Sequence, residues 1–408
     1  MKSYFKINNL KNNIKNIKTG DKSISHRSII YSIIKKQIIE VSNFLESTDL
    51  LSTINLFKNL NLCIYGPINN YILISNFKKK KNNNNINFIG NSGTTIRISL
   101  SLLLKNNILI GDKSLNNRTM YRIIKPLSLM GFIIQCKKNF LTPLIIIKKN
   151  NFGLKYNLIN ISSQVKSCLL IHSVYSFIKI YLIEKKKTRD HSERLFHLIN
   201  NQKKCILLKI PNDISSLTFL ICNFIIKKKK FILTFNFNKF RIGFFDFLLI
   251  NNINFFFLNK KIINNEHIVK ILFLNFKFTV KTIYSNNISK LIDEIPCLSF
   301  FLLNSKNKIK IYGLEELKFK ESNRFLNIYN NLLLLGIRTI KKKNYLIFKC
   351  SKFHLNFFNT SKDHRLFMSI FISNNFNKIS NAENIVSSFP SFLKLFNNKK
   401  NKFYVKIK

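Results

Sequence analysis

The polar stretch of residues 19–28, Thr-Gly-Asp-Lys-Ser-Ile-Ser-His-Arg-Ser, could bind an anion at the start of a helix. If Ser23 is the N-cap, Ser23 and Arg27 lie four residues apart on one helix face, with Lys22 beside them. A hydroxyl, an ammonium and a guanidinium suit a phosphate or a carboxylate there, because the free N–H groups and the helix dipole also favour negative charge. An ordinary cap followed by a solvated basic turn would explain the same residues, so the rest of the chain must decide.

Further polar clusters precede apolar segments that are typical of helices, and strand-like segments separate them. These clusters are residues 90–97, 109–118, 160–167, 188–194, 211–216, 293–296, 315–324 and 362–365. Recurring strand–helix units predict an α/β fold with a repeated module, and inward-pointing helices would bring the clusters to a common site. The cluster at 90–97 is not a nucleotide-binding P-loop, because it lacks the Gly-Lys-Ser/Thr ending.

Local patterns give more detailed expectations for single elements. Leu50, Ile54, Phe57 and Leu60 predict one apolar stripe on a helix that follows a turn after Asn43. The other expected elements are a strand and a turn in residues 1–20, a buried helix at 28–34, two short strands around Gly66-Pro67 within 63–77, a polar loop at 78–85, and a helix at 121–131 that ends at Gly131.

The amino-acid composition limits which classes of protein this chain can belong to. The 408 residues suggest two or three domains, and a hydrophobic share of 46% excludes a disordered chain. The net charge of +50 would normally indicate a nucleic-acid partner. However, the lysines are dispersed among Asn, Ile and Phe, Trp is absent and Ala382 is the sole alanine, which is typical of mutational drift toward A/T-rich codons. We therefore expect no nucleic-acid partner. A basic nucleic-acid-binding protein, which would cluster Lys and Arg on one surface, stays as an alternative.

Cysteine usage and hydropathy bear on the compartment. The seven cysteines form no C-x-x-C pair and lie in apolar segments, which predicts buried free thiols in a reducing compartment. Residues 1–18 lack the apolar core of a signal peptide, and no apolar run approaches the roughly 18 residues of a membrane span. We expect a cytoplasmic protein without a membrane partner.

Taken together, the clusters resemble the 5-enolpyruvylshikimate-3-phosphate synthase family. The matching segments occur in the family's order at 20–27, 90–97, 162–167, 188–194, 213–216, 293–296, 320–324, 363–365 and 388–392. The resemblance and the composition together suggest an A/T-rich reduced-genome bacterium. The resemblance implies an α/β (α+β) fold of two domains, each with three repeated β-α units and inward-pointing helices. One domain would be 21–211 and the other 1–20 plus 212–408, with the active site in a cleft that closes on substrate.

The family's reaction would transfer the enolpyruvyl group of phosphoenolpyruvate to the 5-hydroxyl of shikimate 3-phosphate and release phosphate by addition and elimination. By resemblance, Asp293 and Glu321 are the acid/base groups and Lys22 assists them, which suits the proton transfers that this reaction needs. The resemblance assigns phosphoenolpyruvate to Lys22, Gly93, Arg118, Arg324 and Arg365. It assigns shikimate 3-phosphate to Lys22, Ser23, Arg27, Ser162, Ser163, Gln164, Thr188, Asp293, Glu316 and Lys320. Lys320 and Arg324 are four residues apart, so a helix would put both on one face beside Glu321.

No cofactor or metal is implied, because no cluster has metal-ligand spacing, and the expected state is a monomer. His26, His191 and His364 belong to the matching segments, but we expect no proton transfer from them. The chain departs from the family at Thr19, Thr119, Asn212 and Asn323, and Asn323 puts the ion pairing of Arg324 in doubt.

Two enzymatic alternatives stay open. The sister family transfers enolpyruvate to UDP-N-acetylglucosamine and carries a reactive cysteine five residues before its motif arginine, where this chain has Lys113. A decayed transferase would keep the fold without useful activity.

Overall fold

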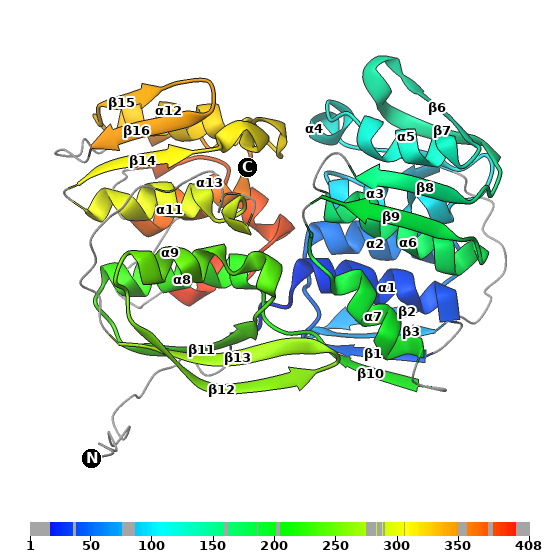
Figure 1. The fold of residues 1–408 in the computed structure, drawn as a ribbon, viewed down its shortest axis with the longest axis horizontal. Helices are drawn as coiled ribbons and strands as arrows, with labels where there is room; N and C mark the ends of the chain where they lie inside the picture. Colours follow the sequence, from blue (N-terminus) through cyan, green and yellow to red (C-terminus); the bar gives the residue numbers. More distant parts are fainter. Residues whose placement is uncertain are drawn as a thin grey trace.

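Two lobes that lie side by side make up the molecule (Figure 1). The computed structural model describes residues 17–35, 38–75, 86–158, 162–185, 187–200, 205–274, 283, 288, 290–305, 307–349, 357–373 and 378–396. The expected strand in residues 1–20, except for 17–20, and the expected polar loop at 78–85 lie outside these residues. Among the described helices, none has the length and apolarity that a membrane crossing requires.

The first lobe contains three sheets in the order β10-β1-β3-β2, β4-β5-β7-β6 and β8-β9. Its helices are α1 (Lys22–Lys35), α2 (Thr48–Asn59), α3 (Gly93–Ser99), α4 (Lys113–Asn116), α5 (Tyr121–Leu129), α6 (Ser163–Ser176) and α7 (His191–Asn200), with short 3-10 helices η1 (Leu100–Leu102) and η2 (Lys138–Phe140). Its strands are β1 (Ile38–Ser42), β2 (Cys63–Ile68), β3 (Tyr71–Ser75), β4 (Ile86–Phe88), β5 (Ile108–Ile110), β6 (Phe132–Lys137), β7 (Leu141–Lys149), β8 (Leu154–Leu158), β9 (Ile180–Glu184) and β10 (Cys205–Lys209).

The second lobe also contains three described sheets, β11-β13-β12, β14-β16-β15 and β17-β18. Its helices are α8 (Ile214–Ile226), α9 (Gly243–Ile250), α11 (Ile295–Phe301), α12 (Arg324–Leu334), α13 (His364–Ser373) and α14 (Phe392–Phe396), with 3-10 helices η3 (Lys239–Arg241), η4 (Leu302–Asn304), η5 (Leu314–Phe319) and η6 (Ala382–Ser387). Its strands are β11 (Phe231–Asn236), β12 (Phe255–Ile263), β13 (Glu266–Phe273), β14 (Lys308–Tyr312), β15 (Thr339–Lys341), β16 (Tyr345–Lys349), β17 (Phe357–Phe358) and β18 (Lys378–Ile379). The predicted α/β class with repeated units is confirmed.

Each lobe has its own apolar core around three packed helices. The first core draws on residues between Ile24 and Ile210, and the second on residues between Ile214 and Phe392. Helices α1, α3 and α6 pack on one another in the first lobe, as α8, α11 and α13 do in the second. These helices tolerate apolar residues on all sides because the sheets and the neighbouring helices enclose them.

The two lobes are joined where the chain crosses between them. Gly20 forms an antiparallel bridge with Asn212, so the two crossing segments lie side by side. The Asn212 side chain accepts from the N–H of Thr19 and donates to the carbonyl of Thr234. Asn212, a departure from the family pattern, therefore connects both crossing segments to β11.

Hydrogen bonds that N-cap side chains accept from first-turn N–H groups explain where most of the inward-pointing helices begin. Ser92, Ser162 and Asp213 accept from the first-turn N–H groups of α3, α6 and α8. The prediction that Ser23 caps the first helix is wrong. The Asp21 carboxylate, directly before the first residue of α1, accepts from the N–H groups of Ser23 and Ile24 and so caps the helix.

Three other expectations also need correction. The turn between β2 and β3 lies at Asn69-Asn70, and Gly66-Pro67 lies inside β2. Lys320 and Arg324 do not share a helix, because Lys320 is extended and α12 begins only at Arg324 after its cap Asn323. The cysteines are not all buried, since Cys205 is exposed on β10; Cys350 lies outside the described residues. The buried helix at 28–34, the apolar face of Leu50, Ile54 and Phe57, and Gly131 just after α5 are confirmed.

Candidate active site

A cleft of about 970 Å³ lies between the lobes, and residues of both lobes line it. The helices α1, α3 and α6 of the first lobe and α8, α11 and α13 of the second lobe all begin at this cleft. Free N–H groups and the positive end of the helix dipole favour anions at a helix N-terminus. Six such ends therefore make the cleft suitable for ligands that carry several negative charges.

Asp293 lies in the turn before α11 and is surrounded by cations. Its carboxylate contacts Arg189 Nη2 at 2.6 Å, Lys320 Nζ at 3.6 Å and Arg324 Nη1 at 4.0 Å. Arg365 donates to the Asp293 backbone carbonyl at 2.8 Å. Burial alone would raise the pKa of Asp293, but the charges of these cations outweigh it and hold the pKa well below its usual range. Asp293 is thus a carboxylate, able to accept a proton.

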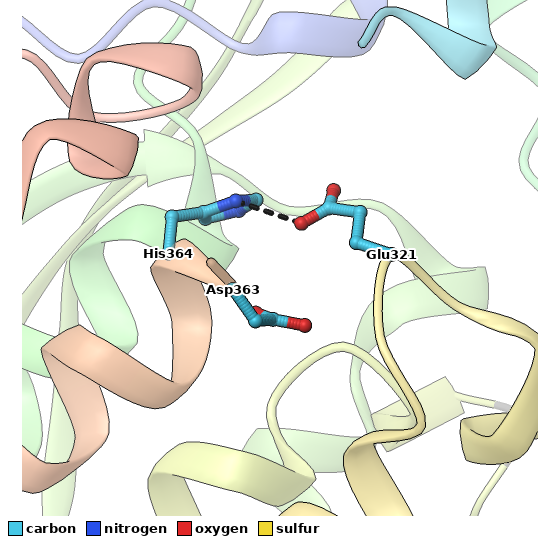
Figure 2. A group of neighbouring side chains, drawn as sticks. All are labelled: Glu321, Asp363 and His364. Atoms are coloured by element: carbon cyan, nitrogen blue, oxygen red, sulfur yellow. Dashed lines mark ion pairs between the residues drawn. The ribbon is translucent and has the colours of Figure 1, made fainter. Parts of the chain in front are cut away.

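Glu321 follows η5 and faces His364, the first residue of α13 (Figure 2). Its Oε2 lies 2.8 Å from His364 Nδ1 and 3.2 Å from Arg324 Nη2. Burial would raise the pKa of Glu321, but His364 and Arg324 outweigh it and hold the pKa well below its usual range. A ligand anion that drew Arg324 away would remove one of these two charges and raise this pKa.

Lys22 extends from the first turn of α1 and pairs with Asp49 of α2 at 2.5 Å. Both side chains line the cleft, on the wall that also carries Gly93 at the start of α3. The ammonium thus shares this wall with a helix N-terminus, whose positive dipole end also favours a phosphate.

Arg324 is the most deeply buried of the predicted anion ligands. Its Nε donates to Asp363 Oδ2 at 2.7 Å, and its side chain is 2% exposed. Asp363 also caps α13 by accepting from the N–H of Arg365 at 2.9 Å. Asn323 caps α12 and leaves these pairs intact, so the doubt about ion pairing at Arg324 is removed.

Glu321, Asp363 and His364 are close enough to hold a metal ion, since one ligand atom of each lies within 4.8 Å of the others (Figure 2). The sequence did not suggest this cluster. The same Arg324 guanidinium bonds to both carboxylates, however, and supplies the positive charge that a cation would bring. This donor set fits an ion-pair network better than a metal.

Arg97, Arg118 and Arg122 of the first lobe face the cleft, and no carboxylate in the described part of the chain forms an ion pair with them. Arg118 donates to Asn91 at 2.6 Å, and Arg97 donates to Gln164 at 3.2 Å. Burial, with the nearby charges of Arg118 and Arg122, lowers the pKa of Arg97 to about 10. Like charges held together in this way favour binding of an anion between them.

Most of the predicted site residues meet in the cleft. The structure places there Lys22, Ser23, Gly93, Arg118, Ser162, Ser163, Gln164, Thr188, Asp293, Glu316, Lys320, Glu321, Arg324 and Arg365. The Thr188 hydroxyl is bonded to Glu184 at 2.7 Å.

Arg27 does not line the cleft. It is buried behind Ser23 and donates to the Ser23 carbonyl and to the hydroxyls of Ser167 and Ser192. Of the histidines, His26 contacts Thr53 and His191 contacts Glu266, both away from the acid/base groups.

Several cleft residues were not predicted from the sequence. They are Asp49, Asn91, Arg122, Lys187, Arg189, Asp213 and Arg241, among others. One signal was present for Asp49, since only 18 acidic residues occur in the chain and such residues resist the compositional drift. Arg189 and Asp213 belong to matching segments, but their partners lie far away in the sequence.

Comparisons with known proteins agree with this geometry. The sequence profile of a family described as EPSP synthase (3-phosphoshikimate 1-carboxyvinyltransferase) matches residues 6–396. A 3-phosphoshikimate 1-carboxyvinyltransferase of Thermoanaerobacter sp. (strain X514) is 31% identical over 402 residues, which cover 92% of this chain and 95% of that protein. The enzyme of the same description from Oceanobacillus iheyensis is 33% identical over 405 residues, which cover 92% and 94%.

Solved structures show the same arrangement. An EPSP synthase structure from Acinetobacter baumannii superposes with a TM-score of 0.77 at 27% identity and covers 92% of this chain and 93% of that one. The enolpyruvyl transferase NikO from Streptomyces tendae superposes with a TM-score of 0.64 at 8% identity, covers 92% of each chain and therefore shows the fold alone.

Proposed function

The chain belongs to the EPSP synthase family, and we propose that its interlobe cleft carries out the family's reaction with the residues assigned below. The chain is a transferase of the shikimate pathway, which leads to the aromatic amino acids. It moves the enolpyruvyl group of phosphoenolpyruvate to the 5-hydroxyl of shikimate 3-phosphate and releases phosphate. Neither the nucleic-acid alternative nor the sister transferase is favoured, and no cysteine is among the cleft-lining residues that the structure describes.

One observation carries the assignment of the cleft: two ionised carboxylates, Asp293 and Glu321, lie among arginines and lysines where six helices begin. Both substrates are multiply charged anions, which the helix ends and the guanidinium groups can bind. The reaction needs bases and acids beside these anions, and the two carboxylates can supply them.

Asp293 accepts the proton of the 5-hydroxyl as this oxygen forms a bond to C2 of phosphoenolpyruvate. Glu321 delivers a proton to the methylene carbon, which gives a tetrahedral intermediate. Elimination then removes a proton from the new methyl group, restores the double bond and breaks the C–O bond to phosphate, which leaves with a proton. Lys22 stabilises the phosphate charge throughout. Binding of the substrate carboxylate to Arg324 weakens one of the two ion pairs that hold Glu321 ionised, so the pKa of Glu321 rises toward the range in which it can donate a proton.

The remaining substrate-binding residues come from both walls of the cleft. Phosphoenolpyruvate binds Lys22, Gly93, Arg118, Arg324 and Arg365. Shikimate 3-phosphate binds Lys22, Ser23, Ser162, Ser163, Gln164, Thr188, Asp293, Glu316 and Lys320. For Arg27 to contact shikimate 3-phosphate directly, its guanidinium must break its hydrogen bond to Ser167 or Ser192 and bind the ligand instead.

The domain limits 21–211 and 1–20 plus 212–408 are part of the same proposal. The bridge between Gly20 and Asn212 and the division of the two cores between Ile210 and Ile214 support them. We also propose a cytoplasmic monomer that does not bind nucleic acid. We propose an A/T-rich reduced-genome bacterium as its source on the bias toward Lys, Asn, Ile and Phe alone.

Phosphate release by the purified protein, given phosphoenolpyruvate and shikimate 3-phosphate together and singly, tests the proposal. We expect release only with both substrates, and a loss of about 100-fold or more in Asp293→Asn and Glu321→Gln. Folded protein that releases no phosphate from this pair would overturn the proposal, and a trial with UDP-N-acetylglucosamine would then test the sister reaction.

A further inference from the structure

The two crossing segments place two helix caps next to each other. Asp21 N–H donates to the carbonyl of Pro211, and Asp213 N–H donates to the carbonyl of Thr19, each at 2.8 Å. Asp21 caps α1 in the first lobe, and Asp213 caps α8 in the second. The two caps are therefore held side by side where the chain crosses between the lobes.

Arg241, at the end of η3, connects both caps through one guanidinium. Nη1 donates to Asp21 Oδ2 at 3.0 Å, and Nη2 donates to Asp213 Oδ1 at 2.9 Å. The arginine side chain is 6% exposed and that of Asp21 is 1% exposed. Charge-assisted hydrogen bonds between buried groups are strong, and the planar guanidinium fixes their directions.

The same guanidinium reaches the turn that carries Asp293. Nη2 also donates to the hydroxyl of Ser215, which in turn donates to Glu294. Glu294 Oε1 lies 4.0 Å from Nη2, and Glu294 is the neighbour of Asp293 in sequence. A continuous polar chain thus runs from the helix that carries Lys22, through Arg241, to the turn that carries Asp293.

We propose that Arg241 is a positioning residue that sets the angle between α1 and α8 and so aligns Lys22 with Asp293. The inference rests on the proposed function for the identity of these two reacting groups. Catalysis is sensitive to such alignment, since a misplacement of about 1 Å can cost about 100-fold in rate. A second interlobe contact, His191 of α7 with Glu266 of β13 at 2.8 Å, keeps the lobes joined without Arg241.

The difficulty in testing Arg241 is that its loss leaves buried carboxylates without a counter-charge. Asparagine is as good an N-cap as aspartate, so Asp21→Asn and Asp213→Asn remove the charges and keep the caps. The triple variant Arg241→Gln/Asp21→Asn/Asp213→Asn therefore removes the cation together with both of its carboxylate partners, and it lacks the ionic connection between the lobes. Arg241→Lys keeps the charge without the planar fork and serves as a second variant. Arg338→Gln, at an exposed arginine of the second lobe, is the matched control.

We expect the triple variant to recover most of the melting temperature that Arg241→Gln loses, while its kcat stays about 10- to 100-fold below wild type. Arg241→Lys should lose kcat similarly, and small-angle scattering should report a changed lobe arrangement in both variants but not in Arg338→Gln. A triple variant with wild-type kcat and scattering would show that Arg241 only neutralises charge. A rise in the KM of one substrate at unchanged kcat would make it a ligand. Either result overturns the proposal. Wild-type protein without phosphate release would instead refute the proposed function, and the scattering comparison would still decide the role of Arg241.

Discussion

Arg189 of the first lobe and Asp293 of the second lobe form an ion pair across the cleft, with 2.6 Å between Nη2 and Oδ2. The two residues are 104 positions apart in the sequence. Their contact joins the walls of the cleft and contributes, after Lys320 and Arg365, to the low pKa of Asp293. Arg189 therefore acts on the group that we assign as the base for the substrate hydroxyl.

Removing this guanidinium should move the pH dependence of the reaction. In Arg189→Gln the pKa of Asp293 rises, because one of its stabilising cations is lost. The acidic limb of the kcat/KM profile should then shift to higher pH, so the loss of activity should be largest at acidic pH and shrink toward neutral pH. Arg189→Lys should restore part of the shift and Arg338→Gln should cause none. An acidic limb at the wild-type position would contradict the role of Arg189.

The His364–Glu321 contact makes a second prediction. His364→Gln removes the main group that holds Glu321 ionised, so the pKa of Glu321 rises and proton exchange with the substrate carbon changes. We expect phosphate release to fall by about 10-fold or more without loss of fold. The exposed His267→Gln is the control, and equal rates in the two variants would exclude a part for His364 in positioning Glu321.

The buried Glu294 carboxylate should lower the free energy of unfolding at neutral pH. Burial, with the nearby Asp293 charge, raises its pKa above that of an unfolded glutamate, despite Arg241. Between the two pKa values the folded state binds more protons, so stability falls as pH rises through this window. Glu294→Gln removes that loss and can still accept the Ser215 hydrogen bond. Its urea midpoint should match wild type near pH 4 and exceed it at pH 8, whereas a pH-independent difference would refute the argument.

The Arg324–Asp363 pair should be a large single contribution to stability. Arg324→Met leaves the fully buried Asp363 carboxylate without its cation, at a cost of about 3–5 kcal/mol in the free energy of unfolding. Arg324→Met/Asp363→Asn should recover most of this free energy, because Asn still caps α13, but not the activity. Denaturant unfolding measures the first effect and phosphate release the second. A double variant no more stable than Arg324→Met would disprove the charge argument.

Lysines along the cleft should steer the anionic substrates. Lys187, Lys239, Lys290 and Lys318 all line it in a chain of net charge +50. Because exposed charges are screened by salt, the KM for shikimate 3-phosphate should rise several-fold between about 0.05 and 0.3 M NaCl. Sucrose at matched osmolarity is the control. A KM that does not respond to salt would limit these lysines to a role in solubility.

The sequence by itself determined the α/β class and the family, and most of the residues it predicted for the site line the cleft. Polar clusters before apolar helices are local signals, since caps and helical periodicity depend on residues within about four positions. The matching segments around Asp293, Glu321 and Arg365 needed no tertiary information to be located.

Only the tertiary structure decided which partner each of these residues meets. Spacing suggested a shared helix for Lys320 and Arg324, but they meet at Asp293 from an extended segment and a helix start. Spacing placed Arg27 with the substrate. However, α6 and α7 pack against α1, so the Arg27 guanidinium forms hydrogen bonds to Ser167 and Ser192. The pairing of Arg189 with Asp293 depends on how two separate cores are set against each other. No local pattern encodes that orientation, because it results from long-range packing and the contacts at the two chain crossings.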